Sequence, residues 1–220
     1  MPSIHQVMVE RLSSGLRPVR APYAIKVQWL LWLSSALVLG LLFFTKMPLR
    51  DDLKESLTTP AFDVMILFIF AAAALSGWGT IEASIPGEEN KGKWKQKTAA
   101  TLWGSAALIF LLFMPCNADN YLEHKTFMPC LLTVLVIGTV YWFLLSLIIR
   151  RNAPLNSRRM GVWTGLSAFL FGLGIITLHC GSQNLYHVLF EHFLPVLAFS
   201  WLMGWLGARW LSGWKRKPIS

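Results

Sequence analysis

Residues 160–190 read MGVWTGLSAFLFGLGIITLHCGSQNLYHVLF and contain no Asp, Glu, Lys or Arg. This uncharged run of 31 residues is too long for one straight span, because a helix needs only about 20 apolar residues to cross a bilayer. Residues 179–184, HCGSQN, divide the run, since clustered polar and Gly residues mark a turn. The sequence therefore predicts two consecutive apolar helices here, over 160–180 and 185–209.

Four further long apolar segments lie N-terminal to this stretch, at 27–45, 61–83, 98–115 and 128–149. Hydrophobic residues make up 55% of the 220 residues and charged residues only 14%, whereas soluble domains carry about 25% charged residues. The first segment follows a long polar stretch, which favours a retained helix over a signal peptide. The sequence predicts an all-α integral membrane protein, with a bundle of six transmembrane helices over 25–214 between a segment 1–24 and a tail 215–220.

The distribution of basic residues predicts the orientation of this bundle. Of the 20 Lys and Arg residues, 16 fall in the N-terminal segment, the 84–97 and 150–159 connections and the C-terminal tail, and four fall on the opposite side. Because cytoplasmic loops are enriched in Lys and Arg, both ends are expected in the cytoplasm of a multi-pass protein of the bacterial inner membrane. Anionic lipid headgroups account for the net charge of +9, so the lipid bilayer is an expected partner and direct nucleic-acid contact is not.

The N-terminal segment contains a predicted amphipathic helix. Its apolar residues follow helical spacing, and Pro18 and Pro22 end the pattern before the membrane. Such a helix can lie on the bilayer surface or enter a groove on a soluble partner, and the pattern favours neither. The apolar positions are Ile4, Val7, Met8, Leu12 and Leu16.

The predicted topology places all three cysteines, Cys116, Cys130 and Cys180, on the side opposite the basic loops. His124, His179, His187 and His192 fall on the same side. Three readings stay open: a structural or redox-active Cys130–Cys180 pair, a soft-metal site of unknown composition, and unreactive thiols. The chain has no C-x-x-C, H-x-x-H or H-E-x-x-H spacing, which would indicate a metal or redox site more strongly.

Glu191 is an ionisable residue inside the last predicted span. Such a group is costly in a bilayer unless it is paired or hydrated, and it is a functional candidate. His187 precedes it by one helical turn, so a plain hydrogen-bonded pair is the simpler interpretation.

No enzyme motif occurs in the chain. It has no G-x-S-x-G nucleophile motif and no phosphate-binding Gly loop. The sequence therefore predicts no catalytic residues and no cofactor.

Several short motifs, taken in order, resemble one family. They are Leu16-Arg17-Pro18-Val19-Arg20, Cys130-Leu131, Arg151-Asn152-Ala153-Pro154, Gly161 with Gly165-Leu166-Ser167-Ala168, Leu178-His179-Cys180, and Gly204, Gly207 and Trp214. In this order and spacing the chain resembles the NrsF-type membrane anti-sigma factors, six-helix inner-membrane proteins of bacteria. Two features depart from the pattern: Cys116 has no counterpart, and residues 186–192 match only loosely.

The resemblance implies a regulator rather than an enzyme. Such a protein holds an extracytoplasmic-function sigma factor at the membrane and releases it on envelope, metal or redox stress, sensed through the outer cysteines. The expected sensing pair is Cys130 and Cys180, and auxiliary sensing or metal-binding candidates are Cys116, His179, His187, Glu191 and His192. The expected sigma-factor contacts are Ile4, Val7, Met8, Leu12, Leu16, Arg17 and Arg20.

The main alternative uses the same cysteines differently. A membrane thiol oxidoreductase would pass electrons from periplasmic thiols to quinone or haem, although the missing C-x-x-C spacing counts against it. A transporter ranks third, because the middle of most predicted spans carries no ionisable group.

Overall fold

The computed structural model describes residues 23–113, 127–182 and 184–212, and every regular element among them is helical. Five of the long helices are α2 (Ile25–Phe44), α4 (Pro60–Ala83), α5 (Lys93–Phe113), α6 (Phe127–Arg151) and α7 (Ser157–His179). The sixth is a continuous run of α8 (Leu185–His187), η1 (Val188–Phe193) and α9 (Leu194–Trp210). A single turn, α3 (Leu53–Ser56), lies between α2 and α4. The predicted all-α chain with six helices long and apolar enough to cross a membrane is confirmed.

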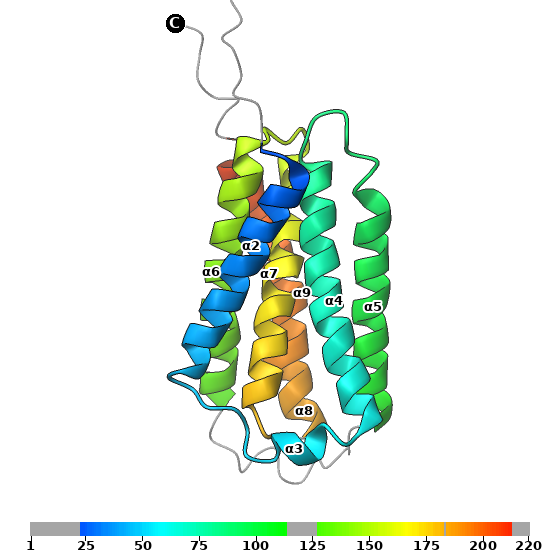
Figure 1. The fold of residues 1–220 in the computed structure, drawn as a ribbon, viewed down its shortest axis with the longest axis vertical. Coiled ribbons are helices and arrows are strands. Elements are labelled where there is room, and N and C mark those ends of the chain that lie inside the picture. Colours follow the sequence, from blue (N-terminus) through cyan, green and yellow to red (C-terminus); the bar gives the residue numbers. More distant parts are fainter. Residues whose placement is uncertain (1–22, 114–126, 183, 213–220) are drawn as a thin grey trace, which may run out of the picture.

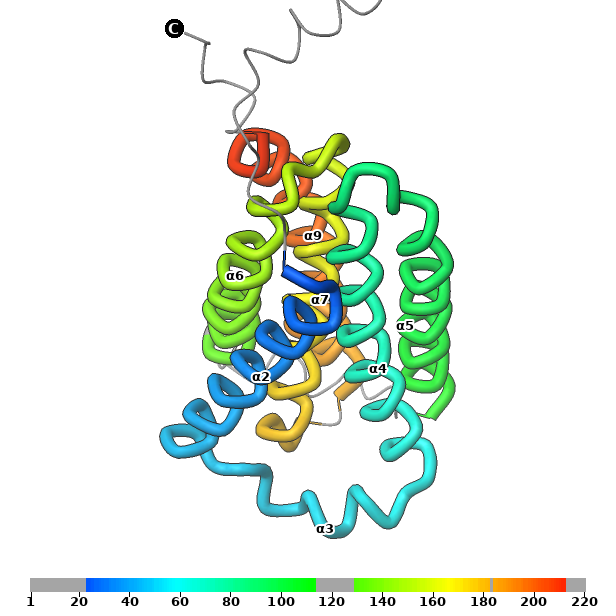
Figure 2. Tube along the Cα trace, turned by 45° about the horizontal axis from the view of Figure 1, so that its top comes forward, coloured from blue at the N-terminus to red at the C-terminus, as the bar shows by residue number. Residues whose placement is uncertain are grey.

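Helix α7 forms the centre of the bundle (Figure 1). It packs against α4, α6 and α9 and is buried through most of its length. Helix α5 packs on the outer side of α4, and α2 lies obliquely against α4 and α6 (Figure 2). Helix α7, which ends just before Cys180, is thus the span most completely shielded from the surroundings.

Helices α7 and α9 approach closely because both carry glycines at the crossing. A Cβ atom added to Gly207 would lie 2.6 Å from the Cα atom of Gly161, closer than real side chains allow. Small residues at helix interfaces let backbones meet in this way in membrane bundles. On the α4 side of α7, the Ser167 hydroxyl donates to the carbonyl of Ala73 at 2.7 Å.

The outer helices keep large apolar side chains on their outward surfaces. Leu41 on α2 and Leu112 on α5 are each 69% exposed, and similar residues surround them on both helices. An exposed apolar surface of this extent fits contact with lipid rather than water.

The bundle has two chemically different ends. One end, called here the basic end, contains the start of α2, residues 84–97 and 150–159, and the end of α9. The other, the cysteine end, contains residues 45–59 with α3, Cys130 near the start of α6, and residues 180–182 and 184–187. Of the 13 described Lys and Arg residues, ten lie at the basic end; the orientation of the bundle in a membrane stays a prediction.

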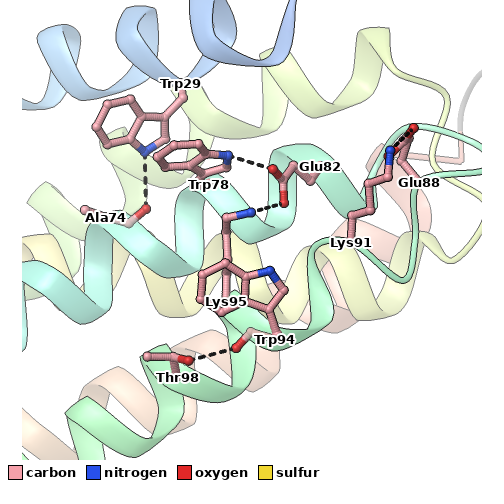
Figure 3. A network of polar contacts seen from close by, with 9 residues as sticks. All are labelled: Trp29, Ala74, Trp78, Glu82, Glu88, Lys91, Trp94, Lys95 and Thr98. Atoms are coloured by element: carbon pink, nitrogen blue, oxygen red, sulfur yellow. Dashed lines mark hydrogen bonds and ion pairs between the residues drawn. The ribbon is translucent and has the colours of Figure 1, made fainter.

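An ion pair joins α4 and α5 at the basic end (Figure 3). Lys95 Nζ lies 2.6 Å from Glu82 Oε2, and the Trp78 indole donates to Glu82 Oε1 at 2.9 Å. The Lys95 ammonium also lies 4.7 Å from the ring centroid of Trp94. Both carboxylate oxygens and the ammonium are therefore paired, which is what a nearly buried charge requires.

A second polar contact at the basic end joins three helices. The Asn152 amide, directly after α6, donates to Gln28 Oε1 of α2 at 2.9 Å and to the Ser84 hydroxyl after α4 at 2.7 Å. All three residues are buried. This contact fixes the start of α2, which directly follows residues 1–22.

Candidate functional site

Cys130 and Cys180 meet at the cysteine end. Cys130 lies in the first turn of α6, directly after Pro129, and Cys180 is the residue that ends α7. The Cys130 thiol donates toward Cys180 with 3.7 Å between the sulfur atoms, and both cysteines are free and partly buried. Because α6 and α7 are consecutive and antiparallel, the turn 152–156 at the far end sets their register and brings the two sulfurs to the same level.

His187, on the next helix, contacts Cys180. The side chain of Asn184 caps α8 by accepting from the amides of Tyr186 and His187, at 2.9 and 3.4 Å. This short turn places His187 Nε2 at 3.3 Å from the Cys180 sulfur. The other ring nitrogen, Nδ1, lies 3.0 Å from Glu191 Oε1.

His192 reaches the same place because the helix is locally π-helical. The segment η1 covers Val188–Phe193, and His187 is its N-cap residue. A π-turn closes hydrogen bonds between residues five apart instead of four, so residues 187 and 192 come onto one face. Their ring centroids are 5.1 Å apart. Single π-turns inside α-helices are frequent at functional sites.

The four side chains form one compact group of ligand atoms. One sulfur from each of Cys130 and Cys180 and one nitrogen from each of His187 and His192 all lie within 4.8 Å of one another. Two soft thiols and two imidazoles are donors that Zn²⁺ and related ions accept. The arrangement can also hold a disulfide if the sulfurs close to about 2.05 Å.

Two buried polar side chains at this cluster have atoms without a hydrogen-bond partner. His192 is 1% exposed and neither ring nitrogen has a hydrogen bond. Glu191 is equally buried, and its Oε2 atom is also unpaired. Buried polar atoms are almost always satisfied in folded proteins, so each exception calls for a physical reason.

The connection between α2 and α4 is fastened to the end of α7 beside the cluster. The Arg50 amide donates to the carbonyl of Leu178 at 3.1 Å, and Arg50 forms two hydrogen bonds with Asp52, at 2.6 and 2.5 Å. The hydrogen bonds from Arg50 hold the pKa of Asp52 below its ordinary value. His179 Nδ1 contacts the carbonyl of Pro48 at 2.5 Å, so this imidazole binds the connection between α2 and α4.

The structure therefore divides the residues that the sequence singled out. Cys130, Cys180, His187 and His192 come together, with Glu191 directly behind His187. His179 is not part of the group. Cys116 and the candidate contacts between Ile4 and Arg20 lie outside the described residues.

The convergence of His187 and His192 was missed from the sequence. The signal that could have found it is H-x-x-x-x-H, because residues five apart share a face only in a π-turn. The pairing of Glu191 with His187 one turn away does follow from helical spacing and was anticipated.

Comparison with known protein families gives a match over most of the chain. The family model NrsF, described as negative regulator of sigma F, matches residues 12–214. Neither the curated proteins nor the solved structures contain a significant match.

Proposed function

We propose a function from one premise: this chain belongs to the NrsF family, negative regulator of sigma F. The match covers nearly the whole chain, from residue 12 to residue 214, and six long apolar helices fit a multi-pass membrane protein. The protein acts as a membrane anti-sigma factor that holds an extracytoplasmic-function sigma factor at the bacterial inner membrane. It releases that factor when envelope, metal or redox stress reaches Cys130 and Cys180.

The observation that carries the sensing role is the apposed thiol pair at the end opposite the basic loops. The two sulfurs are 3.7 Å apart, close enough to bind one ion or to be joined. Joining them as a disulfide would pass two electrons and two protons to a thiol oxidant such as a second disulfide. The excess of Lys and Arg at the other end supports a cytoplasmic position for that end and an extracytoplasmic one for the thiols.

The proposed sigma-factor-binding segment is the N-terminal one, with Ile4, Val7, Met8, Leu12, Leu16, Arg17 and Arg20. Its continuation, α2, is joined at its first turn to α4 and α6 through Gln28 and Asn152. A change at the cysteine end that moves α6 or α7 can therefore reach the start of α2 through packed helices. Two states with different contacts at both ends are what such coupling requires.

Affinity purification in mild detergent tests the contact between the N-terminal segment and the sigma factor. Full-length protein from unstressed cells is compared with a variant lacking residues 2–17, and the bound sigma factor is quantified. We expect a stoichiometric sigma factor with the full chain and its loss from the shortened one. Absence of a sigma factor from the full chain contradicts the proposal, and its retention by both chains moves the contact to the basic loops.

A second purification tests the sensing role. The Cys130→Ser, Cys180→Ser double variant should hold the sigma factor as the parent does and keep it during stress. His179→Asn is the matched control, because His179 lies at the same end outside the thiol pair. Normal release from the double variant would remove the cysteines from the mechanism.

The apposed thiols also suit a thiol oxidoreductase, which is the second candidate. Such an enzyme would reduce a quinone analogue, or a haem acceptor, with electrons from a dithiol. Turnover that depends on Cys130 and Cys180, in protein that binds no sigma factor, would favour it.

A further inference from the structure

We propose that Cys130, Cys180, His187 and His192 form a tetrahedral site for one thiophilic divalent cation of the Zn²⁺ class, with Glu191 positioning His187. The inference rests on the proposed function for its regulatory meaning, because it names the ligand of the same thiol pair. The assignment itself stands on the geometry of the four donors.

The spacing of the donors matches a tetrahedral ion. Two sulfurs bound at about 2.3 Å in a tetrahedron lie about 3.8 Å apart, and the observed separation is 3.7 Å. A sulfur and an imidazole nitrogen on the same ion lie about 3.6 Å apart, and Cys180 and His187 are separated by 3.3 Å. All four donors fall within 4.8 Å of one another, so small side-chain movements close the site.

The unpaired imidazole of His192 has a ready explanation in this assignment. Its ring is 1% exposed and neither nitrogen has a hydrogen-bond partner. An isolated buried imidazole costs free energy, and a metal bond satisfies one nitrogen. The π-turn directs His192 toward His187 and the two cysteines, whereas a regular helix would direct it away from His187.

Glu191 contacts the nitrogen of His187 that does not face the cysteines. His187 directs Nε2 toward Cys180 and Nδ1 toward the carboxylate of Glu191. Metal-binding histidines commonly donate their second N–H to a carboxylate, which fixes the tautomer and the ring orientation. Glu191 is therefore a positioning residue and does not itself touch the ion.

Charge balance selects a divalent ion. Binding converts two thiols to thiolates, so one divalent cation enters and two protons leave. The ion and its four donors are then neutral overall, which a buried position among apolar helices tolerates. A monovalent or trivalent ion would leave a net charge on the same four donors.

Titration with Co²⁺ tests the site directly. The protein is purified whole in detergent with its thiols reduced, and we expect one Co²⁺ per chain, with the intense visible bands of tetrahedral thiolate coordination. Zn²⁺ should displace it. X-ray absorption of the Zn²⁺-loaded protein should show two sulfur neighbours near 2.3 Å and two nitrogen neighbours near 2.0 Å, both about the usual lengths.

Variants assign the donors. Cys130→Ser and His192→Asn should each abolish the tetrahedral spectrum, and His179→Asn, at the same end of the bundle, should leave it unchanged. Glu191→Gln should keep one ion per chain with affinity lowered about 10- to 100-fold.

Three results would overturn the assignment: no Co²⁺ or Zn²⁺ bound by fully reduced protein, a Zn²⁺ shell without imidazole, or an unchanged spectrum in His192→Asn. Sigma-factor recovery from the same preparations separates the two proposals. Metal binding by protein that captures no sigma factor removes the proposed function and leaves the site. Capture by protein that binds no metal removes the site alone.

Discussion

The two ends of the bundle place charged and polar groups inside the protein in opposite ways. At the basic end, Glu82 and Lys95 satisfy each other, and Trp78 satisfies the second carboxylate oxygen (Figure 3). At the cysteine end, His192 and one oxygen of Glu191 are buried without a partner. Paired groups stabilise the contacts between helices, whereas unpaired buried atoms leave donors or acceptors available to a ligand.

The contrast concerns groups that carry charge or bind metal. Asn152 Oδ1 and Gln96 Nε2 are also unpaired at the basic end, but both amides make other hydrogen bonds and neither titrates. A bound cation would reduce the difference between the two ends, because it would give His192 its missing partner. The following predictions test the comparison, beginning with the largest effect.

Breaking the Glu82–Lys95 pair should cause the largest loss of stability. Glu82→Ala leaves a nearly buried ammonium without its counter-charge, and we expect a loss of about 3 kcal/mol in the free energy of unfolding. Unfolding in detergent by heat or denaturant measures it. Lys91→Ala is the control, because Lys91 is 70% exposed in its pair with Glu88 and exposed pairs contribute less than about 1 kcal/mol. Equal losses in both variants would contradict a structural role for the buried pair.

A bound divalent ion should stabilise the protein through the cysteine end alone. At 100 times its dissociation constant, Zn²⁺ should raise the free energy of unfolding by about 2.7 kcal/mol, if it binds only the folded state. Glu82→Ala should retain this gain, whereas His192→Asn should lose it. Thermal unfolding with and without Zn²⁺ checks both variants, and a gain that persists in His192→Asn would place the ion elsewhere.

Removing the Asn152 amide should weaken the attachment of α2. Asn152→Ala leaves Gln28 and Ser84 buried without their partner, and the cost of two such groups is about 2 kcal/mol. Hydrogen exchange should rise in the first turns of α2 more than in α9. An equal rise along both helices would show that Asn152 stabilises the whole bundle and not the start of α2.

The fold was predictable because its signal is local. Long apolar runs between charges, such as the one between Lys26 and Lys46, locate each helix from composition alone. Charged residues can nevertheless continue a helix beyond the apolar core, so α5 begins at Lys93, five residues before the predicted 98.

The candidate site was predictable only in part, because its geometry is not local. Cys130 and Cys180 share a level through antiparallel helices, which the topology anticipates, but their 3.7 Å separation depends on packing. His187 and His192 meet only through a π-turn, which no spacing rule applied to a regular helix would reveal.

Neutralising Glu191 should change stability little, unlike the loss of Glu82. One oxygen of Glu191 is unpaired, and within the described part of the chain its only polar contact is His187, so burial offsets much of what the pair contributes. We expect Glu191→Gln to change the metal-free free energy of unfolding by less than about 1 kcal/mol. Denaturant unfolding of metal-free protein checks this, and a loss as large as that of Glu82→Ala would make Glu191 structural.

The smallest expected effect concerns Asp52, which is ion-paired with Arg50 near the cluster. Its side chain is 38% exposed, so water screens its pair with Arg50, and the contribution to stability should not exceed about 0.5 kcal/mol. Because folding lowers the pKa of Asp52 below 3.8, the contribution is complete above that pH and is lost as pH falls through the folded-state pKa. Comparing melting temperatures of the parent and Asp52→Asn from pH 6 down to pH 3 should show a small difference that shrinks toward the acidic end. A difference that grows on acidification would mean that Asp52 is held as the neutral acid.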